Sequence, residues 1–378
     1  MRPAGAVALA GGLLTLAAFV FDASPLFVPG AALIVLGAGV PGWIWMTARG
    51  GRVQRRLQVA TAIEGEPVDA TIEITRGALG LPGAEVLDPF TGAWLGVAGA
   101  LGPVSSGRRA HIHVVAHFER RGRKQLAPPS LRVKDLLALA IVTKAGNSPT
   151  HELLVLPRTE PVRWSDRGGW RIDRAFRHAA VEAAPASQPD GLRPYRPGAP
   201  ASRIHWPALA RGAGLLERRF QADSDTRPVV VLDARCKLDS PQLDAAVRAA
   251  ASLALELGRQ GGCGVLLPGE RRPIEIDRHL GAWPGVHARL AVVQGGPGVT
   301  APALGHLGGL GGILYVAAQP LARLPLVLRA NPHLMITLVL PKPLHPERRS
   351  VPTFEVAGCR GFLLTGARRK GLESERAA

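Results

Sequence analysis

The chain has 378 residues, a net charge of +17 and a hydrophobic content of 47%. This composition excludes an intrinsically disordered protein and a small disulfide-stapled module. The length predicts two or three domains, and because aromatic residues make up only 5% of the chain, Ala, Val and Leu must fill most of the cores. The three cysteines, Cys236, Cys263 and Cys359, are too widely spaced for a disulfide framework or a clustered zinc site, which favours a reducing compartment.

The first 48 residues contain two long apolar runs. Residues 4–21 and residues 26–46 carry no charge, and each run is close to the roughly 20 residues that cross a bilayer as a helix. A short polar break at 22–25 separates them, so we expect a transmembrane helical hairpin over residues 1–48. The alternative is that the first run is a cleaved signal peptide, but Phe21 lies where a small residue should precede a cut.

Basic residues set the expected orientation of this hairpin. The second run is followed by Arg49, Arg52, Arg55 and Arg56, whereas the break between the runs contains only Asp22 as a charged residue. By the positive-inside rule, we expect both ends of the hairpin and the soluble domains to face the cytoplasm from the inner or plasma membrane. The charges of Arg2 and Asp22 cancel, so residues 49–378 carry the whole +17, which suits an anionic inner leaflet.

Residues 49–157 are predicted to form an antiparallel β-sandwich. Apolar and polar residues alternate over 68–75 and again over 112–118, and glycine and proline punctuate the intervening segments. His111, His113 and His117 share the polar face of the second of these strands. His111 and His113 could chelate zinc as a pair, but His117 is roughly 13 Å further along a strand from His113, so a third ligand is missing and a solvated polar face is the favoured interpretation.

A linker is predicted over 158–192, with a short helix at 170–181, and an α/β domain over 193–378. In this domain, apolar runs alternate with amphipathic segments, which predicts a parallel sheet covered on both faces. The expected strands are 228–233, 264–267, 313–317 and 335–340, and the expected helices are 242–258 and 284–293. The predicted fold class is therefore α+β and multidomain, with a Rossmann-like second domain.

A basic, aromatic segment separates the linker from the first of these strands. Its distinctive residues are Arg193, Tyr195, Arg196, Gly198, Arg203, Trp206, Arg211 and Arg218. Arginine forks beside aromatic faces suit carboxylates, phosphates and acidic protein surfaces. The alternative is structural: these arginines would bond carbonyls and Asp233 while Trp206 packs between the domains.

This segment resembles the signature of the bacterial "domain of unknown function 58" family, which has a G-x-x-R-x-Y-x-x-G-D stretch, an R-x-I-x-W core and an A-R pair. The apolar hairpin and the arginine-glycine segment at 120–123 are similar to features of the same family. The resemblance implies a von Willebrand factor A-like domain, which is often encoded beside a MoxR-type AAA+ ATPase and has no established enzymatic activity.

The chain departs from the family pattern at positions that carry chemistry. Ala199 replaces the aspartate of the signature, and residues 134–137 replace an Asp-Pro-Phe-Gly-like stretch. Where the family implies a D-x-S-x-S metal-binding loop, the chain has Asp233, Arg235 and Lys237. Mg²⁺ needs neutral or negative oxygen ligands, so two cationic side chains oppose it, and we expect a degenerate metal-ion-dependent adhesion site with no bound metal.

The sequence contains no Walker A, zinc-protease or nucleophile-elbow motif, and Cys263 begins an apolar strand, where it is expected to be a buried hydrophobe. We therefore expect no catalytic residues and no cofactor. The predicted function is a membrane-anchored scaffold or adaptor with protein partners. One alternative is a metal-dependent binding or hydrolytic protein that uses Asp233 or the histidine pair; the other, a nucleic-acid binder, lacks a recognisable reader fold.

Overall fold

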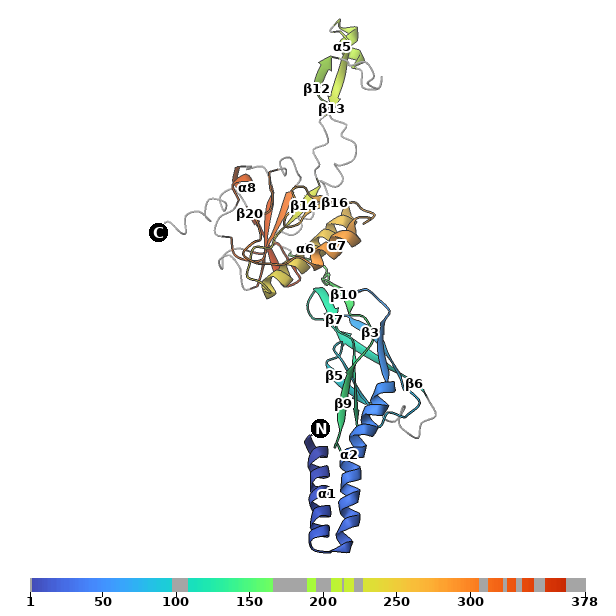
Figure 1. Ribbon diagram of the computed structural model, residues 1–378. Helices are drawn as coiled ribbons and strands as arrows, with labels where there is room; N and C mark the ends of the chain where they lie inside the picture. Colours follow the sequence, from blue (N-terminus) through green and yellow to red (C-terminus); the bar gives the residue numbers. More distant parts are fainter. Residues whose placement is uncertain are drawn as a thin grey trace, which may run out of the picture. The chain divides into compact units, whose positions relative to one another are not determined.

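The computed structural model describes residues 2–96, 108–165, 189–194, 205–212, 214–220, 227–305, 312–321, 325–330, 335–342 and 351–364 (Figure 1). The chain divides into two compact units. The first comprises Met1–Glu119 and Arg123–Val155, and the second comprises Arg120–Gly122 and Leu156–Ala378. The division at Val155 and Leu156 lies two residues before the start of the predicted linker.

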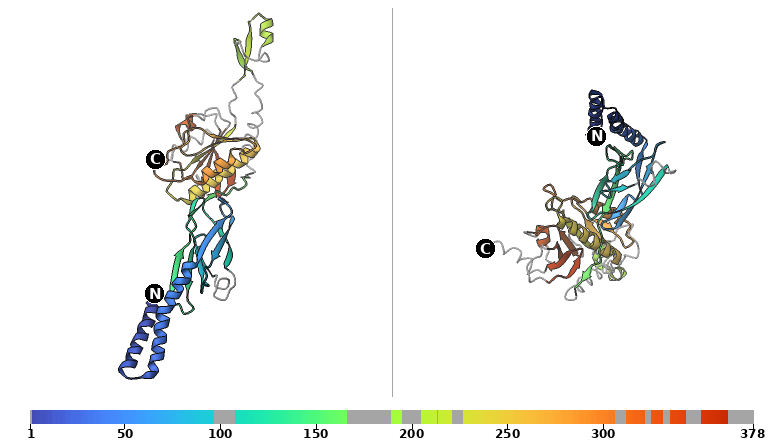
Figure 2. Two further views of the ribbon diagram at one scale, coloured as in Figure 1. Left: turned by 45° about the vertical axis from the view of Figure 1, so that its right-hand side comes forward. Right: turned by 90° about the horizontal axis from the view of Figure 1, so that it is seen from below.

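The two apolar runs form helices α1 (Arg2–Val20) and α2 (Phe27–Gly50), joined by the short 3-10 helix η1 (Ser24–Leu26). Both are long and apolar enough to cross a membrane, and they lie side by side (Figures 1 and 2). α2 continues beyond the end of its apolar run at Met46. The reason is that its last turns bury Ile44 and Ala48 in the core of the strands that follow.

Small residues allow α1 and α2 to approach closely. A Cβ atom added at Gly37 would lie 2.5 Å from the backbone nitrogen of Ala8, and one added at Gly11 would lie 2.8 Å from the carbonyl oxygen of Gly30. Helices in lipid gain little from hydrophobic burial against each other, so close packing at small residues is what favours their association. Large apolar side chains such as Leu13 face outward, which suits contact with lipid.

Ten strands follow in or next to the first unit. They are β1 (Arg52–Leu57), β2 (Thr61–Ile63), β3 (Pro67–Thr75), β4 (Glu85–Asp88), β5 (Ala93–Gly96), β6 (Arg109–His117), β7 (Gly122–Leu126), β8 (Ser130–Lys134), β9 (Ile141–Ala145) and β10 (His151–Leu156). The sheets β1-β3-β6 and β5-β4-β8-β9 are antiparallel, and β2-β10-β7 form a third sheet. The alternating residues of β3 bury Val68, Ile72 and Ile74 in one core shared by the sheets.

A buried ion pair lies inside this β-sheet core. Arg55 of β1 donates to the carboxylate of Asp88 at the end of β4, and both side chains are fully buried. Arg55 also donates to the carbonyl oxygens of Leu126 and Ala127 at 2.8 Å and 3.0 Å. Arg55, which the sequence assigns to the juxtamembrane basic cluster, is thus a core residue, because Asp88 and two carbonyls replace the water its charge would otherwise need.

The second unit contains an eight-stranded sheet in the order β11-β19-β20-β18-β17-β14-β15-β16. Its strands are β11 (Arg163–Trp164), β14 (Pro228–Asp233), β15 (Cys263–Leu266), β16 (Ile274–Ile276), β17 (Gly312–Ala317), β18 (Ile336–Pro341), β19 (Phe354–Val356) and β20 (Cys359–Leu364). The four central strands β15, β14, β17 and β18, which the sequence predicts, are parallel to one another, whereas the outer strands, which it does not predict, pair antiparallel.

Part of the predicted linker belongs to this sheet. β11 pairs with β19, and the ring of Trp164 packs edge-on against Phe354 with 5.1 Å between the ring centroids. The predicted linker over 158–192 thus includes a strand at residues 163–164, which the sequence does not predict because a two-residue edge strand is too short to leave a periodic pattern. The short helix expected at 170–181 lies outside the described residues.

Helices cover both faces of the sheet. The long helix α6 (Pro241–Gln260) packs across β14, β15, β17 and β18, and α7 (Trp283–Ala291) packs against α6 (Figure 1). Val230 and Leu232 of β14 face α6, whereas Val229 and Val231 belong to the opposite core, which Leu328 of the short helix α8 (Leu326–Ala330) helps to close. Because both faces of the sheet are covered, the central strands are buried on both sides and their sequences are continuously apolar.

Candidate functional site

The four central strands define where a ligand would be expected in this fold. Their spatial order is β15-β14-β17-β18, so the chain reverses direction across the sheet between β14 and β17. In open α/β sheets, ligands bind outside the carboxyl ends of the strands at such a switch point. Asp233 is the last residue of β14, and it pairs with Ala317, the last residue of β17. The candidate site is therefore the carboxyl end of β14, at Asp233.

Asp233 is buried and its carboxylate is fully engaged by neighbouring side chains. Arg235 donates from Nη2 to Oδ2 at 2.6 Å and from Nε to Oδ1 at 2.9 Å, and its backbone N–H donates to Oδ1 at 3.1 Å. The hydroxyl of Tyr315, on the neighbouring strand β17, donates to Oδ2 at 2.7 Å. Both carboxylate oxygens therefore hold donors from this chain.

The charges of Asp233 and Arg235 compensate each other within the cluster. The Asp233 hydrogen bonds raise the pKa of the Arg235 guanidinium, and burial together with the Asp233 charge raises the pKa of the Tyr315 hydroxyl. Arg235 therefore stays charged and Tyr315 stays a donor across the physiological range. The arginine balances the one carboxylate, so the cluster has no net charge to offer an incoming cation.

The cluster does not fit the magnesium site that the resemblance implies. A Mg²⁺ ion would need the Asp233 oxygens that Arg235 and Tyr315 occupy, and it would lie close to a guanidinium that repels it. Lys237, the other residue of the degenerate loop, is exposed and adds no oxygen ligand from its side chain. Across the described residues, no group of three or more His, Cys, Asp and Glu side chains has a metal-binding arrangement.

The histidines of β6 show the same lack of a ligand set. His111, His113 and His117 lie on the exposed face of the strand, as the alternation predicts. His113 Nδ1 is 3.4 Å from the hydroxyl of Thr71 on β3, a weak polar contact. The described neighbours place these side chains on a solvated polar face.

A second set of charges lies at the beginning of α6, in the same unit. Asp244, in the first turn of α6, binds the guanidinium of Arg121 and accepts from Nε of Arg120 at 3.0 Å. Arg121 also donates to the carbonyl oxygen of Val293 at 2.9 Å. The sequence interpretation noted residues 120–123 only as part of a resemblance and missed this role, because the partner is 123 residues away.

The basic, aromatic segment forms a small structure of its own. β12 (Pro189–Pro194) and β13 (Leu216–Phe220) pair antiparallel, with Arg193 opposite Glu217 and Arg218 opposite Leu192, and the short helix α5 (Trp206–Ala210) lies between them in sequence. Of the predicted site residues, Arg193, Trp206, Arg211 and Arg218 are thus brought onto one β12-α5-β13 excursion. Tyr195, Arg196, Gly198 and Arg203 lie outside the described residues.

The short helix α5 buries Ala208 and exposes most of its other side chains. Trp206 is 57% exposed, and Leu209 and Arg211 are also exposed. His205 caps the helix, its Nδ1 accepting from the backbone N–H of Ala208 at 3.1 Å. Tryptophan and arginine are residue types that protein interfaces enrich.

The three cysteines lack the lowered pKa of a reactive thiol. Burial raises the pKa of both Cys263 and Cys359 to about 12, so their thiols stay protonated. Cys236 is half-buried, and burial raises its pKa as well. A reactive cysteine needs the opposite shift.

Together these features define an α+β protein with two helices that could cross a membrane. The four central strands of its large sheet are parallel, and the ion pair between Asp233 and Arg235 occupies the carboxyl end of β14 at the switch point. No protein-family model matches the chain, and no curated protein sequence matches it.

Proposed function

We propose that the chain is a non-catalytic, membrane-anchored scaffold that docks a protein partner through the β12-α5-β13 excursion. The observation that carries the proposal is the Asp233–Arg235–Tyr315 cluster, which fills the position where an α/β sheet of this order would bind an external ligand. With the carboxyl end of β14 closed, the exposed Trp206 and Arg211 are, among the side chains that the structure describes in the second unit, of the types that protein interfaces enrich.

The charge of the excursion sets the chemistry of the partner. Residues 190–219 contain six arginines against one aspartate and one glutamate. A positive surface of this kind accelerates association with an acidic protein surface and weakens as salt increases. The resemblance to the domain of unknown function 58 family supports a von Willebrand factor A-like domain and a MoxR-type AAA+ ATPase as the partner.

The excursion can be tested on the full chain reconstituted in lipid nanodiscs. Binding of the MoxR-type ATPase from the same organism would be measured for the wild type and for Trp206→Ala/Arg211→Glu, with Arg259→Glu as a control at an exposed residue of α6. We expect the double variant to bind more weakly, with the largest difference at low salt, while the control binds normally. Equal binding by a folded double variant would remove the excursion from the interface.

The membrane orientation is a separate part of the proposal. The arginines after Met46 favour a cytoplasmic location for both units. A reporter that is active only in the cytoplasm should therefore be active when it is fused after Ala378. Activity of a reporter that requires export would overturn this orientation.

A further inference from the structure

The hairpin formed by β8 and β9 presents an apolar turn to solvent. Leu136 is 97% exposed and Leu137 is 67% exposed, and Ile141 at the start of β9 is also exposed. Large apolar side chains gathered at this level of exposure mark a contact surface more often than chance. The position of the turn along α2 indicates what it contacts.

Contacts within the first unit give the direction of the hairpin. Both β8 and β9 pack against α2, and Figure 1 shows β9 next to α2. Lys144, at the far end of β9 from the turn, donates from Nζ to the carbonyl oxygens of Arg49 and Gly51, each at 3.2 Å. Val40, earlier in α2, packs against the same core as β8 and β9. The hairpin therefore runs from the end of α2 back along the helix toward Val40.

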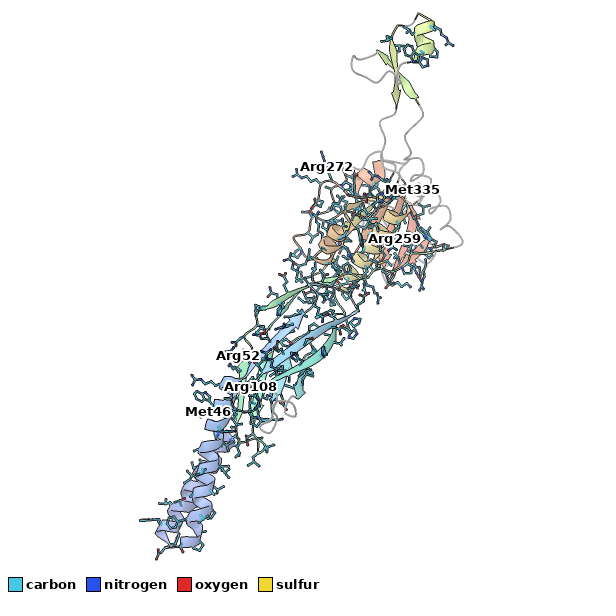
Figure 3. All side chains as sticks on the ribbon, turned by 90° about the vertical axis from the view of Figure 1, so that its right-hand side faces the viewer. Met46, Arg52, Arg108, Arg259, Arg272 and Met335 are labelled. Atoms are coloured by element: carbon cyan, nitrogen blue, oxygen red, sulfur yellow. The ribbon has the colours of Figure 1, made fainter. Side chains whose placement is uncertain are left out.

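The start of α1 and two tryptophans indicate that the membrane surface lies near the level of Val40. A Cβ at Gly37 would touch both Ala4 and Ala8, so the first residues of α1 lie about one turn beyond Gly37 along α2. Trp43 and Trp45 follow there, about half exposed, and tryptophan favours the bilayer interface. Figure 3 labels Met46 and Arg52, on either side of the point where α2 gives way to the strands.

The backbone groups of the turn form hydrogen bonds within the turn, so the turn can enter an apolar environment. The carboxylate of Asp135 accepts from the backbone N–H of Leu137 at 2.9 Å and of Ala140 at 2.7 Å, and the N–H of Ala138 donates to the Asp135 carbonyl. These bonds satisfy backbone groups inside the turn, which an apolar environment requires. They also hold the leucines outward in a fixed conformation.

We propose that Leu136, Leu137 and Ile141 insert into the head-group region of the bilayer beside α2. The hairpin then provides a third membrane contact, in addition to α1 and α2, and fixes the first unit against the lipid surface. This inference rests on the proposed membrane anchoring, since the depth of the β8-β9 turn in the bilayer is inferred from its position along α2. The turn belongs to two strands that pack against α2, whose exposed side chains near this level include Trp43, Trp45 and Met46, and this apolar setting selects lipid as the occupant over a soluble partner.

The test measures the depth of single labelled residues in the full chain. A Cys236→Ser background leaves Cys263 and Cys359, which are buried. An environment-sensitive fluorophore would be attached to Leu136→Cys in vesicles of phosphatidylcholine and phosphatidylglycerol that contain lipids with quenching groups. Trp43→Cys serves as the reference in α2. Glu66→Cys is the control, because Glu66 is exposed and directly precedes β3. This end of β3 is roughly 26 Å from Thr75 at the other end, and Thr75 pairs with Arg52 at the start of β1.

We expect lipid quenchers to reduce emission at Leu136→Cys as much as at Trp43→Cys, and to leave Glu66→Cys bright. Quenching at Trp43→Cys without quenching at Leu136→Cys would overturn the inference while leaving the anchor intact. Absence of quenching at both would overturn the anchor as well. The label at Leu136→Cys could instead be shielded from both lipid quenchers and aqueous iodide, with shielding that increases with the amount of protein per vesicle. That result would show that the turn contacts a second copy of this chain and would overturn lipid insertion.

Discussion

Arg235 holds both carboxylate oxygens of Asp233, two residues before it in the chain, at the switch point of the large sheet. A guanidinium thus occupies the space next to the one strand-end carboxylate that an external cation would use. Because Tyr315 donates to the same carboxylate, the cluster forms part of the folded structure and leaves no ligand position at Asp233.

Removing the arginine should therefore destabilise the second unit. In Arg235→Met, the buried Asp233 keeps its charge and loses its cation, which should lower the free energy of unfolding by about 2 kcal/mol. Arg259→Met, at an exposed position of α6, should change it by less than about 0.5 kcal/mol. Chemical denaturation of the two variants measures the difference. Equal stability would mean that the ion pair contributes nothing to folding.

The pair between Arg55 and Asp88 should be worth more, because both side chains are fully buried. We expect Arg55→Met to cost about 3–5 kcal/mol, and the double variant Arg55→Met/Asp88→Asn to cost less than the sum of the single changes. Arg123 and Glu152 form an exposed pair in the same unit, with 67% and 57% of their side chains accessible. Breaking that pair should cost no more than about 1 kcal/mol. A similar cost for the two pairs, in denaturant titrations, would contradict this assignment.

His287 should make the stability of the second unit depend on pH. It is buried, stacks on Trp283, and its Nε2 donates to the carbonyl oxygen of Pro157 at 2.8 Å. Burial lowers the pKa of His287 below its ordinary 6.5, so as pH falls the unfolded chain takes up this proton before the folded chain does. Stability should then decrease below about pH 6.5, by at most about 1.4 kcal/mol per pH unit from this residue.

The measurement for His287 is the slope of unfolding free energy against pH from about pH 7.5 to pH 5. His287→Gln keeps a side-chain donor and cannot titrate, so its slope should be shallower than that of the wild type. Identical slopes in the two proteins would assign the acid sensitivity to other groups.

Close packing of α1 and α2 can be tested with two glycines of the same helix. A side chain at Gly37 would collide with Ala8, whereas a Cβ at Gly39 would meet nothing within 4 Å. Both substitutions, Gly37→Val and Gly39→Val, change helix propensity equally. Only Gly37→Val should destabilise the hairpin, by about 1–3 kcal/mol for overpacking. Thermal unfolding in detergent micelles, followed by the helical circular dichroism signal, would show a lower melting temperature for Gly37→Val alone. Equal shifts would argue against the observed helix contact.

The sequence predicts the elements that have a strong local pattern. The uninterrupted apolar runs at 4–21 and 26–46 become α1 and α2, and the apolar stretches at 228–233 and 313–317 become β14 and β17. The stripe at 242–258 becomes the central part of α6. Each of these segments has a length and a hydrophobic pattern that favour the structure it adopts.

Other features depend on partners far away in the chain and leave no local signal. The strands β11, β19 and β16 are only two or three residues long, and their existence depends on the neighbours with which they pair. The burial of Arg55 depends on Asp88, and the role of Arg121 depends on Asp244. The loop 233–237 was predicted as degenerate from its cationic residues, but the involvement of Tyr315 requires the register of β17 beside β14.

The measurement that tests the account most directly is a titration of Mg²⁺ into the untagged full chain, combined with thermal unfolding in the presence and absence of a chelator. With Arg235 bound to both Asp233 oxygens, we predict no saturable magnesium binding and the same melting temperature with and without chelator. A ligand that binds the native state must raise its stability. A chelator-induced decrease in melting temperature that Asp233→Asn abolishes would show that the strand edge is an open metal site and would contradict the proposed scaffold.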